Sequence, residues 1–182
     1  MWGFVRAIEW LTRLFGLIGA WLAAFLIVAM VYEVLSRYLL GAPTFWAYEV
    51  GYMLMGASFM FGIAYALQLR RHIRVDFLYD NLSPKQQAAI DLAGFVLLLL
   101  PVVCWTTWGL WGYFHDAYRL GEVSGESAWN PVVWPFRLTF VAGFAIFALQ
   151  ILAEIIKCGY VLTGRDLPDA GQHGPAVPEH VA

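Results

Sequence analysis

The polar residues that could do chemistry are concentrated in one stretch, LQLRRHIRVDFLYDNL. Arg70, Arg71, His72 and Arg74 lie within five positions, and Asp76 follows them. This pattern fits three kinds of site: a clamp for nucleic acid or phosphate, a site that handles ions, or a loop that fixes the orientation of a protein in a membrane. The sequence on either side of the stretch distinguishes among these three kinds of site.

Those elements are strongly apolar. Of 182 residues, 61% are hydrophobic and 13% are charged, whereas about 25% of residues are charged in an ordinary soluble domain. Charge-free runs of about 20 residues can cross a hydrocarbon layer about 30 Å thick. We therefore predict an all-α integral membrane protein with four transmembrane helices. The expected spans are 14–36, 45–69, 90–114 and 133–157.

The first span is predicted to be retained, because its apolar run is longer than the core of a typical signal peptide. With four spans, both termini lie on one side together with the central loop. Eight of the 11 Lys and Arg residues fall on that side, and Lys and Arg mark cytoplasmic loops. We therefore predict cytoplasmic termini. Residues 1–13 would form an N-terminal flank, 14–162 the membrane domain, and 163–182 a disordered cytoplasmic tail.

The central loop is predicted to lie at the cytoplasmic interface, where arginines contact anionic lipid headgroups. Nucleic-acid binding is not expected, because the net charge is −2 and three arginines make too small a footprint. Ser83, Pro84 and Gln86 form the signature of a helix start with a capping box. A helix from Pro84 to Phe114 would be longer than the membrane is thick, and Pro101 should bend it.

Acidic residues lie at the ends of the predicted spans. Glu33 precedes Arg37 by four residues and Glu154 precedes Lys157 by three, which are the spacings of helical ion pairs. Glu49 begins the second span. No carboxylate, histidine or lysine lies near the centre of a span, where ion paths and proton relays place their ionisable groups. The chain is therefore not expected to transport by itself.

Catalytic and cofactor sites are not expected either. His72 and His115 lie at opposite membrane faces, whereas haem or metal ligation between helices needs histidines that face each other. Cys104 and Cys158 are predicted to be packing residues, with no disulfide between them. We predict no enzyme activity, no cofactor, no metal site and no substrate-binding residue in this chain.

Small and aromatic residues indicate how the helices associate. Ser58 and Gly62 share one face of the second span, and Gly16 and Gly19 lie in the first, so these two helices can pack closely. Many of the nine tryptophans lie near the connection between the first two predicted spans or near the connection between the last two. They fit either an interfacial aromatic belt or a broad contact with another membrane subunit.

The order of these features resembles the small permease (DctQ-type) subunit of TRAP transporters, the tripartite ATP-independent periplasmic transporters. The matching stretches include FWAYEVGYMLMGASFMFGIAYAL, RRHIRVDFLYDNLSP and WPFRLTFVAGFAIFALQILAEII. A Glu near the start of the second span and a His-[Val/Ile]-Arg-Val-Asp element after it are typical of that family. They correspond here to Glu49 and to the segment from His72 to Asp76. GESAWNPVVWPFR is similar to the mannitol, chloroaromatic or 2-oxo-acid branch.

The resemblance implies a multi-pass protein of the bacterial inner membrane. Its partners would be a large permease (DctM-type) subunit, a periplasmic solute-binding protein and membrane lipids, with no nucleic acid. Together they would take up an organic acid or related solute, driven by a cation, Na+ in this family. Because the family's substrate and sodium sites lie in the large permease, the small subunit would act as a scaffold.

Two alternatives from other classes remain open at this point. One is a membrane anchor for a redox enzyme. The other is a small, self-sufficient proton-coupled transporter that uses Glu33 or Glu49. The role of the HIRVD element is also open, because Arg74 and Asp76 either hold the assembly together or lie in a solvated loop that acts only in topology.

Overall fold

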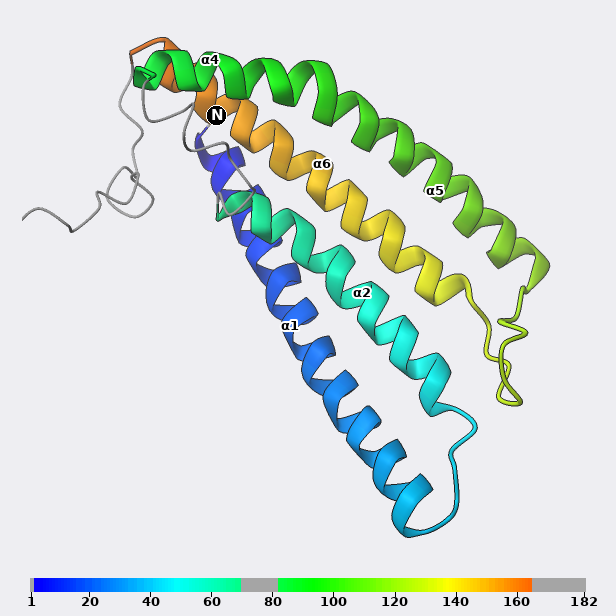
Figure 1. The fold of residues 1–182 in the computed structure, drawn as a ribbon. Helices are drawn as coiled ribbons and strands as arrows, with labels where there is room; N and C mark the ends of the chain where they lie inside the picture. Colours follow the sequence, from blue (N-terminus) through cyan, green and yellow to red (C-terminus); the bar gives the residue numbers. More distant parts are fainter. Residues whose placement is uncertain (1, 70–81, 165–182) are drawn as a thin grey trace, which may run out of the picture.

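The computed structural model describes residues 2–69 and 82–164. This part of the chain is all-helical, and one isolated bridge between Val123 and Val132 closes the last connection. These findings confirm the predicted fold class. The helical segments are α1 (Trp2–Leu39), α2 (Ala47–Gln68), α4 (Pro84–Gly94), the π-helical turn η1 (Phe95–Leu99), α5 (Leu100–Leu120) and α6 (Trp134–Leu162) (Figure 1).

Four helices in the described residues are long and apolar enough to cross a membrane: α1, α2, the continuous run Lys85–Leu120, and α6. α1 has 38 residues, so at 1.5 Å per residue it is about 57 Å long. It begins at Trp2, and the flank that precedes the predicted first span is therefore helical as well. The helix must extend well beyond a hydrocarbon layer about 30 Å thick.

The third span begins as its sequence predicts. The Gln86 amide donates to the Ser83 hydroxyl, and the Ser83 amide donates to the Gln86 side-chain oxygen at 2.9 Å, which together form the capping box. The helix then curves through η1 (Figure 1). Pro101 follows this turn, and a proline ring clashes with the carbonyl four residues earlier. That carbonyl belongs to Leu97, inside the widened turn, so the π-helical turn accommodates the proline.

The helices lie side by side in the order α1, α2, α6, α5 (Figure 1). The end of the bundle that holds the N-terminus, the end of α2, the start of α4 and the end of α6 is called the terminal end below. The opposite end, the loop end, holds the α1–α2 connection (40–46) and the α5–α6 connection (121–133). At the terminal end α1 also reaches α6, where Val5 and Ile8 pack with Ala153.

The main core lies where α2, α5 and α6 meet. Its buried members are Ala64, Leu67, Val103, Ile146, Phe147 and Ile151. Two glycines let a neighbouring helix approach with its backbone. A Cβ at Gly143 of α6 would lie 2.7 Å from the backbone oxygen of Met60 in α2, and a Cβ at Gly19 of α1 would lie 3.0 Å from that of Ser58. The second contact places α1 against the small-residue face of α2, as predicted.

Candidate subunit-contact surface and its polar anchors

The charged motif that the sequence singles out cannot be placed. Arg70, Arg71, His72, Arg74 and Asp76 lie outside the described residues. Their role stays a prediction. The remaining polar candidates gather in distinct clusters at the two ends of the bundle.

At the terminal end, polar side chains of α1 and α6 form one connected network. The Thr12 hydroxyl donates to the Gln150 side-chain oxygen at 3.0 Å, and the Gln150 side-chain nitrogen donates to Glu154 at 2.9 Å. The Lys157 ammonium donates to both Glu154 and Glu9, the latter at 3.0 Å. Thr12 and Gln150 are fully buried. The network thus joins α1 to α6 inside the bundle, although the two helices are far apart in the sequence.

At the loop end, Glu33 ties α1 to the connection that follows it. One carboxylate oxygen accepts hydrogen bonds from the Arg37 guanidinium, with the Nε at 2.9 Å. The other accepts the Thr44 amide at 2.9 Å and the Thr44 hydroxyl. The Ser36 hydroxyl also donates to the Ala42 carbonyl at 2.6 Å. Glu33 therefore holds the 40–46 connection in place, with both of its oxygens engaged.

Glu49 has a different environment in the first turn of α2. Its side chain is fully buried, and one carboxylate oxygen accepts a hydrogen bond from the Ser127 hydroxyl of the α5–α6 connection. The other oxygen is buried and has no hydrogen-bond partner in the described part of the chain. Since buried polar atoms are nearly always bonded, an unpartnered carboxylate oxygen is a candidate for function.

Arg137 supplies the positive charge at the loop end of α6. Its guanidinium donates two hydrogen bonds to the Glu122 carboxylate, one of them at 2.7 Å, and a third to the Tyr113 carbonyl at 3.2 Å. Its Cζ lies 3.5 Å from the centre of the Tyr113 ring. An arginine inside an apolar run signals in the sequence that a partner is needed. It does not identify Glu122 as that partner, and sequence reasoning missed this pair.

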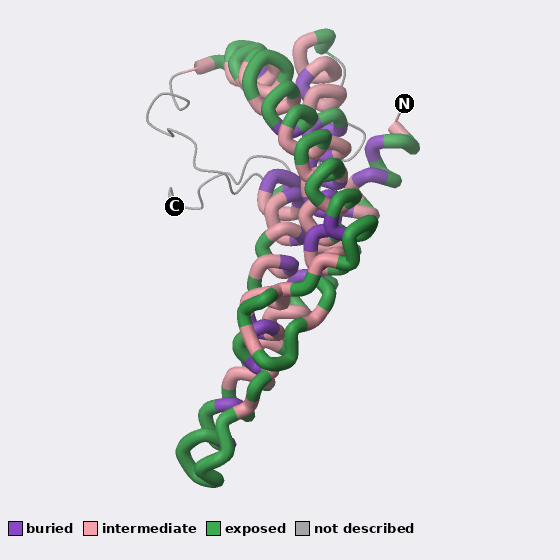
Figure 2. The backbone as a smooth tube through the Cα atoms, turned by 90° about the vertical axis from the view of Figure 1, so that its right-hand side faces the viewer, coloured by how far each residue is buried: buried purple, intermediate pink, exposed green. Residues whose placement is uncertain are grey.

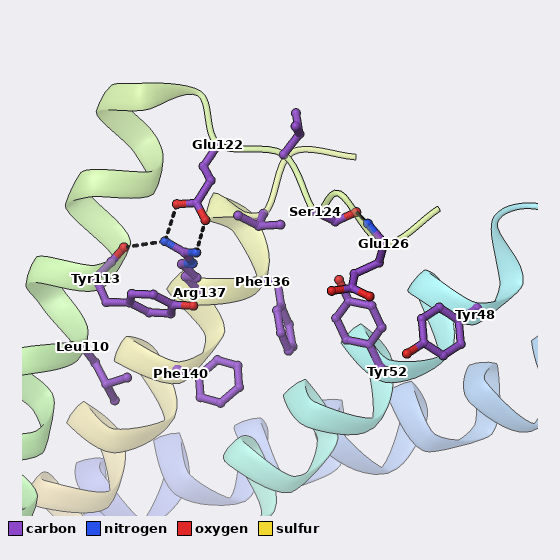
Figure 3. A pocket seen from close by; sticks show the side chains of 12 residues that line it. Tyr48, Tyr52, Leu110, Tyr113, Glu122, Ser124, Glu126, Phe136, Arg137 and Phe140 are labelled. Atoms are coloured by element: carbon purple, nitrogen blue, oxygen red, sulfur yellow. Dashed lines mark hydrogen bonds and ion pairs between the residues drawn. The ribbon is translucent and has the colours of Figure 1, made fainter. Parts of the chain in front are cut away.

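A cavity of about 540 Å³ lies between these groups at the loop end. Figure 3 shows its walls, which come from the ends of α2, α5 and α6 and from the α5–α6 connection. Aromatic rings form much of the lining, with carboxylates at two places. The lining residues are Tyr48, Tyr52, Leu110, Tyr113, Glu122, Val123, Ser124, Glu126, Val133, Phe136, Arg137 and Phe140.

The largest surface feature is apolar. Figure 2 shows buried positions in short stretches along the helices, with intermediate and exposed positions covering much of the rest. On α5, Trp105 is 84% exposed and Trp108 is 82% exposed. Trp21 and Phe25 of α1 and Phe59 of α2 are more than half exposed as well. Soluble monomers rarely expose apolar patches of this extent, so lipid or another membrane subunit must cover these faces.

Four spanning helices, apolar outer faces and polar groups gathered at the helix ends define a multi-pass membrane protein. The family model for tripartite ATP-independent periplasmic transporters, DctQ component, matches residues 26–158, well over half of the chain. The chain belongs to this family, which makes it the small membrane subunit of a TRAP-type transporter and confirms the predicted resemblance. Comparisons with curated proteins and with solved structures give no match.

Proposed function

We propose that this subunit is a scaffold that assembles with the large permease (DctM-type) subunit in the bacterial inner membrane, with both termini in the cytoplasm. The periplasmic solute-binding protein delivers an organic acid or related solute to this complex. Uptake is coupled to a cation, Na+, which crosses with the solute through the large permease. The role of the small subunit is to hold the immobile part of the complex in the membrane.

One observation carries the scaffold role, namely the exposed tryptophans deep in the apolar run of α5. Trp105 precedes His115 by ten residues, so it lies about 15 Å along the helix from the nearest histidine or acidic side chain on that side. Tryptophan prefers the membrane interface, where its N–H finds an acceptor. In hydrocarbon the indole N–H of an exposed Trp105 has no acceptor. A neighbouring protein helix would provide both contact area and acceptors.

The polar clusters support a structural role as well. Glu33 has both oxygens bonded within its own hairpin, and Glu154 is bonded to Gln150 and Lys157. A proton or ion path needs groups that exchange partners near the membrane centre. These groups instead lie toward the helix ends and join one element of the subunit to another. Such contacts suit a rigid frame.

The HIRVD element is proposed to anchor this frame at the cytoplasmic interface. Arg74 would bind a carboxylate or a lipid phosphate, while Asp76 holds the segment to the assembly. We expect Asp76→Asn to lower the yield of the complex without inverting the topology of the chain. Unchanged assembly would favour the alternative, a solvated loop whose arginines act only in topology.

The test of the scaffold role is co-expression with a large permease (DctM-type) subunit from the same genome, followed by purification through a tag on this chain. We expect the permease to be recovered in constant ratio. Replacing Trp105 and Trp108 together by Leu should reduce that recovery at least fivefold, whereas Trp129→Leu in the α5–α6 connection serves as the matched tryptophan control. Full recovery with the double variant would contradict the proposed surface.

A reconstitution experiment separates the scaffold from a self-sufficient transporter. Liposomes that contain this chain alone should show no solute-dependent proton flux, and flux should require the large permease. Flux from the single chain that Glu49→Gln abolishes would overturn the scaffold role. A haem absorbance band in the purified protein would instead favour a redox anchor.

A further inference from the structure

The cavity at the loop end contains a complete cation site at one of its two ends. There the Arg137 guanidinium lies over the Tyr113 ring and is bonded to the Glu122 carboxylate. The Arg137 side chain is only 10% exposed. A carboxylate, an aromatic face and a backbone carbonyl are together a favourable environment for a guanidinium. This end of the cavity shows which groups the chain uses to hold a cation.

The other end of the cavity offers the same kinds of group without a cation. In Figure 3 the Glu126 carboxylate lies beside the Tyr52 ring, with Tyr48 and Ser124 close by. The centres of the Tyr48 and Tyr52 rings are 5.8 Å apart, in an edge-on arrangement. Within the residues that the structure describes, the Glu126 carboxylate takes part in no hydrogen bond or ion pair. A carboxylate and two tyrosine rings are thus assembled here, and no cation from the described residues is paired with the carboxylate.

Glu49 adds an independent sign of missing positive charge in the same region. It lies in the same turn of α2 as Tyr48 and Tyr52, and its one bonded oxygen accepts from Ser127, the neighbour of Glu126. Its other oxygen is buried without a partner. The described lining of the cavity thus contains the carboxylates of Glu122 and Glu126 but one basic residue, Arg137, while the buried Glu49 lies behind Tyr48 and Tyr52.

We propose that the Glu126 end of this cavity binds a basic side chain, the guanidinium of Arg or the ammonium of Lys, from a partner protein. The inference rests on the proposed function in that it requires such a partner at the loop end. A zwitterionic lipid headgroup fits less well, because its phosphate would lie beside the Glu122 and Glu126 carboxylates while the Arg137 charge is already paired. A bare metal ion fits less well because aromatic carbon forms much of the wall.

The first test measures cation binding by the full chain alone, in nanodiscs of phosphatidylcholine. The probe is N-acetyl-arginine methylamide, with N-acetyl-norleucine methylamide as its uncharged counterpart, followed by saturation-transfer NMR. We expect saturable binding of the arginine probe only. Glu126→Gln should weaken this binding at least tenfold, because it removes the negative charge that attracts the probe. Glu126 is exposed, so the replacement leaves the fold intact. Tyr52→Leu should weaken the binding as well.

The matched control is Asp116→Asn, since Asp116 is an exposed acid of α5 that does not line the cavity. This variant should bind the probe like the original chain. Three results would overturn the proposal: no saturable binding, equal binding of the uncharged probe, or equal binding by Glu126→Gln. Phosphocholine binding as strong as that of the arginine probe would assign the cavity to lipid instead.

The second test asks whether a protein occupies the cavity in the complex. Carbodiimide with glycine ethyl ester labels accessible carboxylates, which mass spectrometry then quantifies. Labelling of Glu126 should fall at least fivefold when the large permease and the binding protein are present, while labelling of Asp116 stays constant. A complex that forms with Glu126 fully reactive would overturn this inference alone. Failure of the complex to form would instead count against the scaffold function. The probe experiment would still show whether the cavity binds a basic side chain.

Discussion

At the terminal end of the bundle, polar side chains from two helices bond to each other, whereas at the loop end they bond mainly to the connections between helices. Thr12, Gln150 and Lys157 join α1 to α6 directly. Glu33 and Glu49 bond instead to Thr44 and Ser127, both of which lie in connections. The terminal end is therefore built to keep helices together, and the loop end to shape the surface between them.

This difference agrees with the shape of the molecule. In Figure 1 the helices converge at the terminal end and spread toward the loop end. The cavity lies at the spread end, where the Glu126 carboxylate lines it and one oxygen of the neighbouring Glu49 has no hydrogen-bond partner in the described part of the chain. A subunit with one closed end and one open end can remain rigid while it offers a specific surface to a partner. The comparison predicts that the single largest stability loss comes from the buried ion pair at the terminal end.

The largest effect is expected from Lys157→Met at the terminal end. The Glu154 side chain is 3% exposed, and the substitution removes its only cationic partner among the described residues. Breaking a buried pair by removing one partner costs about 3–5 kcal/mol. Equilibrium unfolding in mixed micelles should show this loss. A second variant that adds Glu154→Gln should recover part of it, and equal stability of all three chains would contradict the network.

At the loop end, Ser127→Ala should have the next largest effect. It removes the one hydrogen bond that the buried Glu49 carboxylate makes with residues that the structure describes. Hydrogen bonds to charged groups contribute about 1.5–3 kcal/mol, and the same unfolding experiment should report a loss in that range. Ser124→Ala is the matched control, because the Ser124 hydroxyl accepts only a long bond from the Glu126 amide. Equal losses for the two serines would show that Glu49 does not depend on Ser127.

The sequence predicts the parts of this architecture that neighbouring residues determine. The four spans follow from charge-free runs, and the start of α4 follows from Ser83 and Gln86, three residues apart. The true lengths of the helices do not follow. α1 begins at Trp2 and α5 continues to Leu120, because a helix does not have to end where its apolar run ends.

Local sequence patterns do not predict most of the contacts that distinguish the two ends of the bundle. Helical spacing places Glu33 near Arg37 and Glu154 near Lys157. Thr12 and Gln150 are 138 positions apart, and no periodicity connects them. An isolated threonine in an apolar helix looks like any small packing residue, so only the arrangement of α1 against α6 shows that it is a hydrogen-bond donor.

Thr12→Val tests this hidden contact with a smaller expected effect. The substitution keeps the shape of the side chain but leaves the Gln150 oxygen without its donor. Hydrogen bonds between membrane helices contribute about 0.6 kcal/mol on average, so a loss near that value is expected in the unfolding experiment. Thr106→Val is the control, because the Thr106 hydroxyl bonds to a carbonyl of its own helix. A loss with Thr106→Val that matches the loss with Thr12→Val would argue against a specific α1–α6 bond.

The smallest change in global stability is expected from Glu33→Gln, since this residue orders a connection and not a helix pair. The Thr44 amide donates to the Glu33 carboxylate and should exchange with deuterium severalfold faster in the variant, while the unfolding transition stays in place. Arg37→Gln is the sharper control, because it removes the ion pair but keeps both Thr44 bonds. Protection of Thr44 should survive in that chain. If Glu33→Gln destabilised the whole bundle as Lys157→Met does, the two ends would not differ in the way their hydrogen bonds indicate.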